Sequence, residues 1–353
     1  MRSLNIFLVF IIVSLSYLLS SCSDDIVKPK VGGINTGYIP QESAECLTLA
    51  SLAYVNENNS SYIRDSLIIQ LANTSYATGG KWMLDWGPAL TPDLSNMVYI
   101  VKDVTTDPDR YAIAIRGTDW CFPFNWEEDL GAIDFAAYPY GGTGDSVSYG
   151  ALQGLNSLLT LRDSATNKTL ISYLNNISAT NNQMYITGHS LGGLLTTVFS
   201  AWFLDNGFGS KFHLKTYTFA APTAGNEQFK QHYSQIFSSA NAESFRVENP
   251  KDLVHYFNGE LNTVITNHIP TDYPFKVGLV LTGIEAYFQS YDMVYVHVGE
   301  RIALGTTNPS DCSFAPGTLD QYKCWVLYEH HPDTYLTLMG AANTNVSYVP
   351  CSW

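Results

Sequence analysis

The chain has 353 residues, of which 46% are hydrophobic and 14% are charged, so it can bury a large core and its composition excludes wholesale disorder. Its 18 basic and 32 acidic side chains give a formal net charge of −14, which argues against nucleic acid or an anionic membrane surface as a partner and favours uncharged substrates. No internal repeat or long linker follows residue 40, so we expect a single domain over residues 41–353.

The first 40 residues are typical of an export segment followed by a tether. Arg2 precedes an almost uninterrupted apolar run from Ile6 to Leu19, which indicates an export signal over residues 1–21. The run leads into Cys22 in a context similar to a bacterial lipobox, in which the cysteine is acylated and holds the mature protein on a membrane. Residues 22–40 are polar and contain Gly and Pro, as in a flexible tether. We therefore expect an outer-membrane or cell-surface lipoprotein; secretion after an ordinary signal peptide, and a retained membrane anchor, are the alternatives.

The remaining pattern predicts helices and strands that alternate along the chain. Helical spacing of apolar residues covers 41–54, 149–175 and 191–204, and short β-type runs cover 97–101, 111–115, 184–187, 214–220 and 245–247. This alternation predicts an α/β fold with a mostly parallel central sheet and helices on both faces. In such sheets the active site lies at the carboxyl ends of the strands.

A G-x-S-x-G sequence, Gly188-His189-Ser190-Leu191-Gly192, lies between the predicted strand at 184–187 and the predicted helix at 191–204. A sharp strand-to-helix turn leaves little room for side chains two residues on either side of the serine, which explains the glycines. The Ser190 hydroxyl then projects above the sheet, and the backbone amide of Leu191 points toward the place where an oxyanion forms. This context favours a nucleophilic serine over a serine in a plain glycine-rich turn.

Several segments resemble, in the same order, motifs of the class 3 (fungal-type) lipase family of the α/β-hydrolase superfamily. They are Ile115-Arg116-Gly117-Thr118, Asn125-Trp126-Glu127-Glu128-Asp129-Leu130, Gly188-His189-Ser190-Leu191-Gly192-Gly193, the turn Phe219–Asn226 and the loop Asn249–Val254. The resemblance implies the α/β-hydrolase fold over about residues 41–340. Ile115 stands where the family usually has phenylalanine. The stretch from Asn262 to Lys323 has no close match apart from Val296–Glu300.

A nucleophilic serine requires a histidine that takes its proton and a carboxylate that orients the histidine. Asp252 follows the predicted strand at 245–247 and matches the acid loop of the family. The segment Glu329–Tyr335 resembles the family's late histidine loop and contains two candidates for the base. The spacing to Tyr335 favours His330, and His331 remains the alternative. His255, His268 and His297 fit this role less well.

The resemblance also assigns an oxyanion hole and a lid. Thr118 corresponds to the family's oxyanion-hole residue, which acts together with the amide of Leu191. An aromatic cluster follows directly and consists of Trp120, Phe122, Phe124 and Trp126. The cluster fits either a plain core or the lid that the family carries at this place.

Cysteine spacing gives one further expectation. Among the five cysteines after Cys22, Cys312 and Cys324 form the most local candidate pair for a disulfide, which an exported protein permits. No Cys/His spacing indicates a zinc site, and we expect neither a metal nor a cofactor.

These observations together predict a serine ester hydrolase that cleaves acylglycerols or other lipid esters through an acyl-enzyme. Phospholipase A1 and short-chain or feruloyl-type esterase activities remain open. The rival from another class is a non-catalytic surface lipoprotein that binds lipids or glycans on the same fold. The sequence leaves the oligomeric state open.

Overall fold

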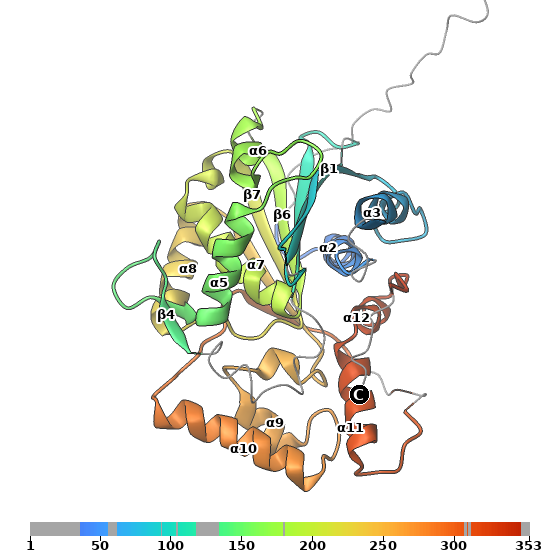
Figure 1. Cartoon of the computed structure of the whole chain (residues 1–353), viewed down its shortest axis with the longest axis vertical. Coiled ribbons are helices and arrows are strands. Elements are labelled where there is room, and N and C mark those ends of the chain that lie inside the picture. Colours follow the sequence, from blue (N-terminus) through green and yellow to red (C-terminus); the bar gives the residue numbers. More distant parts are fainter. Residues whose placement is uncertain are drawn as a thin grey trace, which may run out of the picture.

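A computed structural model describes residues 36–55, 62–92, 94–103, 105–117, 134–178, 181–306, 309 and 312–346. Its centre is a seven-stranded sheet with the spatial order β1-β2-β3-β6-β7-β8-β9 (Figure 1). These strands are β1 Trp82–Leu90, β2 Met97–Asp103, β3 Arg110–Arg116, β6 Asn182–His189, β7 Phe212–Phe219, β8 Glu243–Glu248 and β9 Glu300–Ala303. The β1–β2 and β2–β3 pairs are antiparallel, and every pair from β3 to β9 is parallel. The predicted α/β-hydrolase sheet is therefore confirmed.

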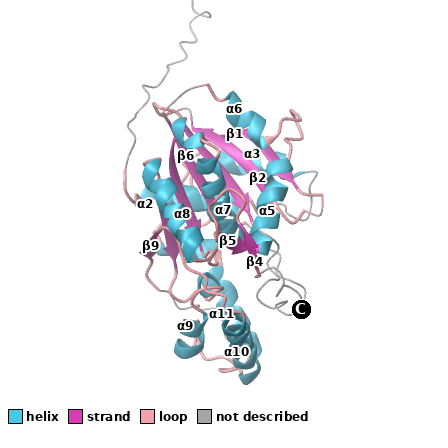
Figure 2. Cartoon of the chain, turned by 90° about the vertical axis from the view of Figure 1, so that its left-hand side faces the viewer, coloured by secondary structure: helices cyan, strands magenta, loops and turns pink. Residues whose placement is uncertain are grey.

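Helices cover both faces of this sheet (Figures 1 and 2). One face carries α5 Tyr149–Thr160, α6 Leu170–Asn176, α7 Leu191–Asp205 and α8 Glu227–Ser239. The other face carries α2 Pro40–Leu52, α3 Ile63–Leu71 and α12 Pro332–Leu338. A small two-stranded sheet is formed by β4 Phe135–Ala137 and β5 Ser146–Ser148.

The alternation of side chains along each strand separates two hydrophobic cores. In β3, Ile113 and Ile115 belong to the core under α5 to α8, whereas Ala112 and Ala114 belong to the core under α2 and α3. Both sets are fully buried, which explains why the strand reads as a continuous apolar run. Within the described ranges no helix is long and apolar enough to cross a membrane.

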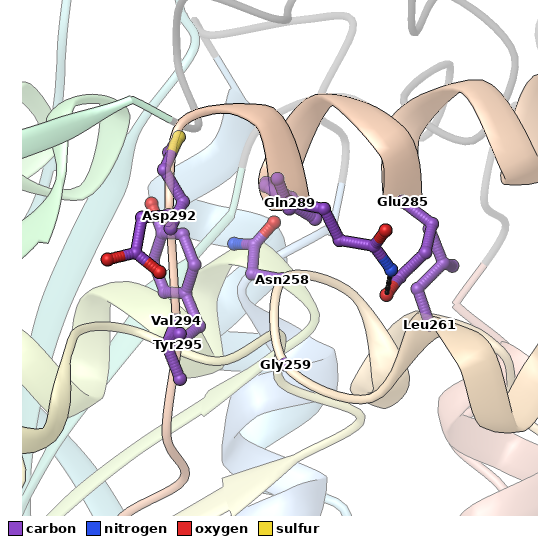
Figure 3. Close-up of a pocket in the computed structure, with 10 residues that line it drawn as sticks. Asn258, Gly259, Leu261, Glu285, Gln289, Asp292, Val294 and Tyr295 are labelled. Carbon is purple, nitrogen blue, oxygen red and sulfur yellow. Dashed lines mark hydrogen bonds between the residues drawn. The ribbon is translucent and has the colours of Figure 1, made fainter.

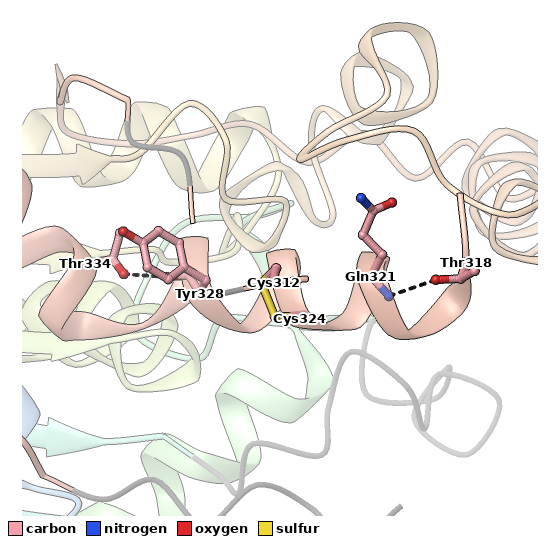
Figure 4. The surroundings of a disulfide bond; sticks show 6 residues. All are labelled: Cys312, Thr318, Gln321, Cys324, Tyr328 and Thr334. Carbon is pink, nitrogen blue, oxygen red and sulfur yellow. Dashed lines mark hydrogen bonds between the residues drawn. A yellow bond between two sulfur atoms is a disulfide. The ribbon is translucent and has the colours of Figure 1, made fainter. Parts of the chain in front are cut away.

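A third hydrophobic cluster lies at the end of the sheet where the parallel strands finish. It is formed by α9 Leu261–Asn267, α10 Phe275–Ser290, α11 Leu319–His330 and the short 3-10 helix Val254–Tyr256. Both views show these helices together at one end of the molecule. The predicted disulfide between Cys312 and Cys324 is confirmed, and it ties the chain before α11 to α11 itself (Figure 4).

The predicted continuous helix over 149–175 is wrong, because the chain forms two helices there. Asp163 breaks the pattern: its carboxylate accepts hydrogen bonds from the backbone amides of Ala165 and Thr166, in a turn after α5. Thr169 then caps α6, since its hydroxyl accepts a bond from the amide of Ser172.

Candidate active site

Ser190 lies in the turn between β6 and α7, in a conformation that few non-glycine residues adopt. Its backbone has φ 60° and ψ −131°. A Cβ atom at Gly188 would lie 2.2 Å from the carbonyl oxygen of Gly192, and one at Gly192 would lie 2.4 Å from the carbonyl oxygen of Ile115. The turn therefore accepts only glycine at both places, and its tight packing holds the strained serine in position.

A chain of two hydrogen bonds connects Ser190 to Asp252 through His330, the last residue of α11. The Nε2 atom of His330 lies 2.8 Å from the Ser190 hydroxyl oxygen, and its Nδ1 atom lies 2.8 Å from Oδ2 of Asp252. Asp252 is completely buried, and a carboxylate oxygen only accepts. His330 Nδ1 is therefore the donor to Asp252, which leaves Nε2 free to accept the proton of the serine hydroxyl.

Asp252 has two further hydrogen bonds that support its negative charge. The backbone amide of Val254 donates to Oδ1 at 2.9 Å, and the hydroxyl of Tyr335 donates to Oδ2 at 2.7 Å. Burial and the neighbouring Asp252 raise the pKa of Tyr335 well above its usual value, so this phenol keeps its proton and remains a donor. Charge-assisted bonds of this kind stabilise a buried carboxylate.

A side-chain amide fastens the loop that bears Asp252 to the end of α11. The Nδ2 atom of Asn249 donates to the carbonyl oxygen of Glu329 at 3.0 Å and to Oε2 of the same residue at 2.7 Å. The backbone amide of Asn249 also donates to the Tyr335 hydroxyl at 3.2 Å. Burial raises the pKa of Glu329, whose side chain is fully enclosed. The acid and the histidine are thus held in one network.

His189, the residue before Ser190, contributes to the same network from β6. Its Nε2 atom lies 2.8 Å from the carbonyl oxygen of His330, an acceptor, so this nitrogen carries a proton. Burial and the nearby His330 lower the pKa of His189 well below its usual value, which keeps the ring neutral. This role could not be predicted from the sequence pattern, because position 189 is variable in G-x-S-x-G.

His331, the alternative base, has a different surrounding. Its Nδ1 atom accepts a hydrogen bond of 3.1 Å from the backbone amide of Asp333, and the residue caps the start of α12. Burial lowers its pKa. Of the two neighbouring histidines, His330 is the one whose ring contacts Ser190.

Of the two candidate oxyanion-hole residues, Leu191 lies within the described residues and Thr118 does not. Leu191 begins α7, where the helix N-terminus favours negative charge. Gly117 reaches this point too, since a Cβ atom on it would lie 2.4 Å from the amide nitrogen of Gly192. The next residue, Thr118, lies outside the described residues. The same holds for Cys22 and for the lid candidates Trp120, Phe122, Phe124 and Trp126.

The other candidate histidines lie elsewhere. His255 is fully buried, and burial lowers its pKa well below the usual value. His297 lies 3.0 Å from the Thr223 hydroxyl, and burial lowers its pKa to about 3. His268 is largely exposed at the end of α9. In the part of the chain that the structure describes, no group of three or more His, Cys, Asp or Glu side chains is arranged to hold a metal ion.

A separate pocket of about 350 Å³ lies between the start of α9 and the end of α10 (Figure 3). Its described lining consists of Asn258, Gly259, Leu261, Glu285, Phe288, Gln289, Asp292, Met293, Val294 and Tyr295. Ser190, His330 and Asp252 are not in this lining, so the pocket is distinct from the hydrogen-bonded chain.

Comparison with known proteins agrees with this geometry. The family Lipase (class 3) matches residues 112–260, which include Ser190 and Asp252. Lipase ZK262.3 of Caenorhabditis elegans is 34% identical over 79 residues, a match that spans 22% of this chain and 21% of the nematode protein. The match thus covers about a fifth of that relative.

Solved structures share the fold over a larger part of the chain. M37 lipase aligns with a TM-score of 0.71 at 21% identity, over 86% of this chain and 93% of its own. LIP2 lipase of Yarrowia lipolytica aligns with a TM-score of 0.52 at 16% identity, over 77% of this chain and 83% of its own. At these identities the likeness concerns the fold. The chain is therefore similar to class 3 lipases over residues 112–260, and it shares the α/β-hydrolase fold with these lipase structures.

Proposed function

We propose that this protein is a carboxylic ester hydrolase of the lipase type, with Ser190 as nucleophile, His330 as general base and Asp252 as the orienting acid. The observation that carries the proposal is the hydrogen-bonded chain Ser190–His330–Asp252, with both distances at 2.8 Å. A nucleophile within reach of a base that a third group orients is the arrangement required for covalent catalysis. The lipase family match supports the choice of ester bonds.

The geometry supports a two-step acyl transfer. Ser190 Oγ attacks the ester carbonyl carbon while its proton passes to His330 Nε2, which gives a tetrahedral intermediate and an imidazolium that Asp252 stabilises. The imidazolium then protonates the leaving alcohol, and the C–O bond of the ester breaks to leave an acyl-Ser190. A water molecule repeats the sequence: His330 takes its proton, the acid is released and Ser190 regains its proton.

The negative oxygen of the intermediate requires donors close to Ser190. The backbone amide of Leu191 at the start of α7 is one proposed donor, and Thr118 is the other. The approach of Gly117 to the amide of Gly192 supports this assignment for Thr118, since the two residues are adjacent in the chain. The aromatic segment from Trp120 to Trp126 is the proposed lid.

We propose lipid esters, acylglycerols first, as the substrates. An uncharged substrate suits a protein with a formal net charge of −14. We also propose that an acylated Cys22 holds the enzyme at a membrane or cell surface. The export segment and the tether in the sequence support this anchoring.

The test is hydrolysis of p-nitrophenyl esters over a range of acyl lengths, then of emulsified triacylglycerol and of phosphatidylcholine, by the wild type and by Ser190→Ala. We expect the wild type to cleave medium- or long-chain esters and triacylglycerol, and the variant to lose the rate by a factor on the order of 10⁶. Faster cleavage of phosphatidylcholine would indicate a phospholipase, and activity only on short chains an esterase. Undiminished hydrolysis by Ser190→Ala would refute the proposal.

A further inference from the structure

Large exposed hydrophobic side chains are concentrated in one part of the chain. Of the fourteen such side chains among the described residues, seven lie between residues 275 and 319. They are Phe275, Leu279, Val280, Tyr291, Val294, Phe314 and Leu319. Single exposed hydrophobic residues need no explanation, but such a concentration on neighbouring elements indicates an interaction surface.

Helix α10 carries the core of this surface because it has two apolar sides. Leu281, Ile284 and Phe288 are buried in the cluster with α9 and α11. On the opposite side, Phe275 is 79% exposed and Leu279, one turn later, is 56% exposed. An exposed apolar side of a helix is costly in water.

The exposed row of α10 is also uncharged over most of its length. After Phe275 and Leu279 it continues through Thr282, Gly283 and Ala286, all of them exposed. The helix has only two charged side chains, Lys276 and Glu285, and Glu285 faces the pocket beside Gln289 rather than this row (Figure 3). The outward side of α10 therefore presents no carboxylate, in a protein where acidic side chains outnumber basic ones by 32 to 18.

The position of α10 relates this surface to the candidate active site. The helix lies with α9 and α11 at the end of the molecule where the parallel strands finish, and α11 ends in His330. The hydroxyl of Tyr287 donates to Asp134 at 2.6 Å, and the rings of Phe135 and Tyr295 are 4.4 Å apart. Asp134 is the first described residue after the segment that holds the lid candidates, so α10 is attached to the chain where that segment returns.

We propose that the outward side of α10, centred on Phe275 and Leu279, is a docking surface for an uncharged or zwitterionic lipid surface. The inference rests on the proposed function, because lipid esters are presented to an enzyme as droplets or bilayers. The apolar side chains enter the boundary of the lipid, and the lack of carboxylates on this side avoids burying charge there. The acidic remainder of the protein disfavours anionic lipid. In this proposal α10 lies on the lipid surface with its outward side and does not cross the lipid layer.

The test compares two double variants, each of which removes two exposed hydrophobic side chains from one helix. The first variant, Phe275→Ser with Leu279→Ser, changes α10. The second, Ile68→Ser with Ile69→Ser, changes α3, where Ile68 is 46% and Ile69 71% exposed. Helix α3 lies at the other end of the molecule. All proteins compared carry Cys22→Ser, because an acylated Cys22 would hold every variant on the vesicles. Partition onto phosphatidylcholine vesicles is measured by flotation, and hydrolysis of the soluble ester p-nitrophenyl acetate serves as a control. We expect the α10 variant to partition roughly ten- to hundredfold more weakly, and the α3 variant to match the wild type. Both should keep the wild-type rate on the soluble ester.

A gain-of-binding variant removes the remaining ambiguity. Leu279→Trp should strengthen partition severalfold, because tryptophan favours the lipid–water boundary. Equal partition of the wild type and the α10 variant, or equal losses in the α10 and α3 variants, would overturn the docking proposal. A wild-type dimer that the α10 variant dissolves, with partition unchanged, would assign the surface to a second copy and also overturn it.

Failure of the proposed function would look different. If the wild type hydrolyses no ester but partitions through α10, the docking surface stands and the hydrolase proposal falls. If it hydrolyses esters but partitions independently of α10, the reverse holds.

Discussion

The serine turn and the outward side of α10 are opposite extremes in the room they leave for side chains. At Gly188 and Gly192 an added Cβ atom would lie within 2.4 Å of backbone oxygen atoms, whereas at Gly283 on α10 nothing lies within 4 Å. The turn must hold a strained serine against a histidine, so its neighbours are fixed. A surface that only contacts lipid has no such requirement, and its residues need only be apolar.

The family match covers the serine turn but not α10. The matched residues 112–260 include the serine turn and the acid loop, and they end before α9 and α10 begin. The match includes Ser190 and Asp252 but ends before His330, so it covers only part of the hydrogen-bonded chain and none of α9, α10 or α11.

The largest expected effect concerns the two adjacent histidines. His330→Ala should lower kcat by a factor on the order of 10⁶, because the ring that contacts Ser190 and Asp252 is lost. His331→Ala should retain most of the rate and lose about 1 kcal/mol of stability, since His331 caps α12. Ester hydrolysis and thermal unfolding of both variants check this. A severe loss of activity in His331→Ala with an active His330→Ala would transfer the base to His331.

The next effect compares two glycines, one from each region. Gly192→Ala should destabilise the fold by roughly 3–5 kcal/mol, because the new methyl group meets the carbonyl oxygen of Ile115. Gly283→Ala should instead stabilise it by about 0.5–1 kcal/mol, as expected for an exposed helix interior with open space. Chemical denaturation of both variants measures the difference. Similar free energies of unfolding would show that the turn is not as tightly packed as described.

A smaller effect separates support of the acid from general stability. Tyr335→Phe removes a donor to Asp252 and should lower kcat about tenfold with KM nearly unchanged, as the loss of a charge-assisted bond predicts. Tyr256→Phe is the matched control from the segment that follows Asp252, since its hydroxyl donates to the carbonyl of Pro250 and not to Asp252. Steady-state kinetics of the two variants decide between the roles. Equal losses in kcat would mean that Tyr335 only stabilises the loop.

Much of the fold was predictable because buried strands leave a strong local signal. The runs at 97–101 and 111–115 are apolar throughout, the run at 184–187 is apolar except for Thr187, and each forms part of a strand of the sheet. The edge strand β1 was missed because it contains Asp85, Gly87 and Pro88, which are unfavourable in strands, and its register with β2 is irregular. An edge strand tolerates these residues, because one side of its backbone has no neighbouring strand to pair with. Hydrophobic periodicity alone does not show that a segment lies at the edge of a sheet.

The site was predictable at its reacting groups and not at their supports. Ser190, Asp252 and His330 lie in motifs that resemble a known family, and the structure brings their side chains together. The bonds made by Asn249 and Glu329 join residues 80 positions apart in the chain, so no local pattern reveals them. The available signal was that Asn249 and Glu329 each begin a segment that resembles the family, Asn249–Val254 and Glu329–Tyr335.

The most direct measurement of the central claim is covalent labelling with a fluorophosphonate, followed by mass spectrometry of the modified peptide. An activated serine reacts where ordinary serines do not. The account predicts a single label on Ser190, no label in Ser190→Ala, and labelling slowed by orders of magnitude in His330→Ala. A label on another residue, or undiminished labelling of Ser190→Ala, would contradict it.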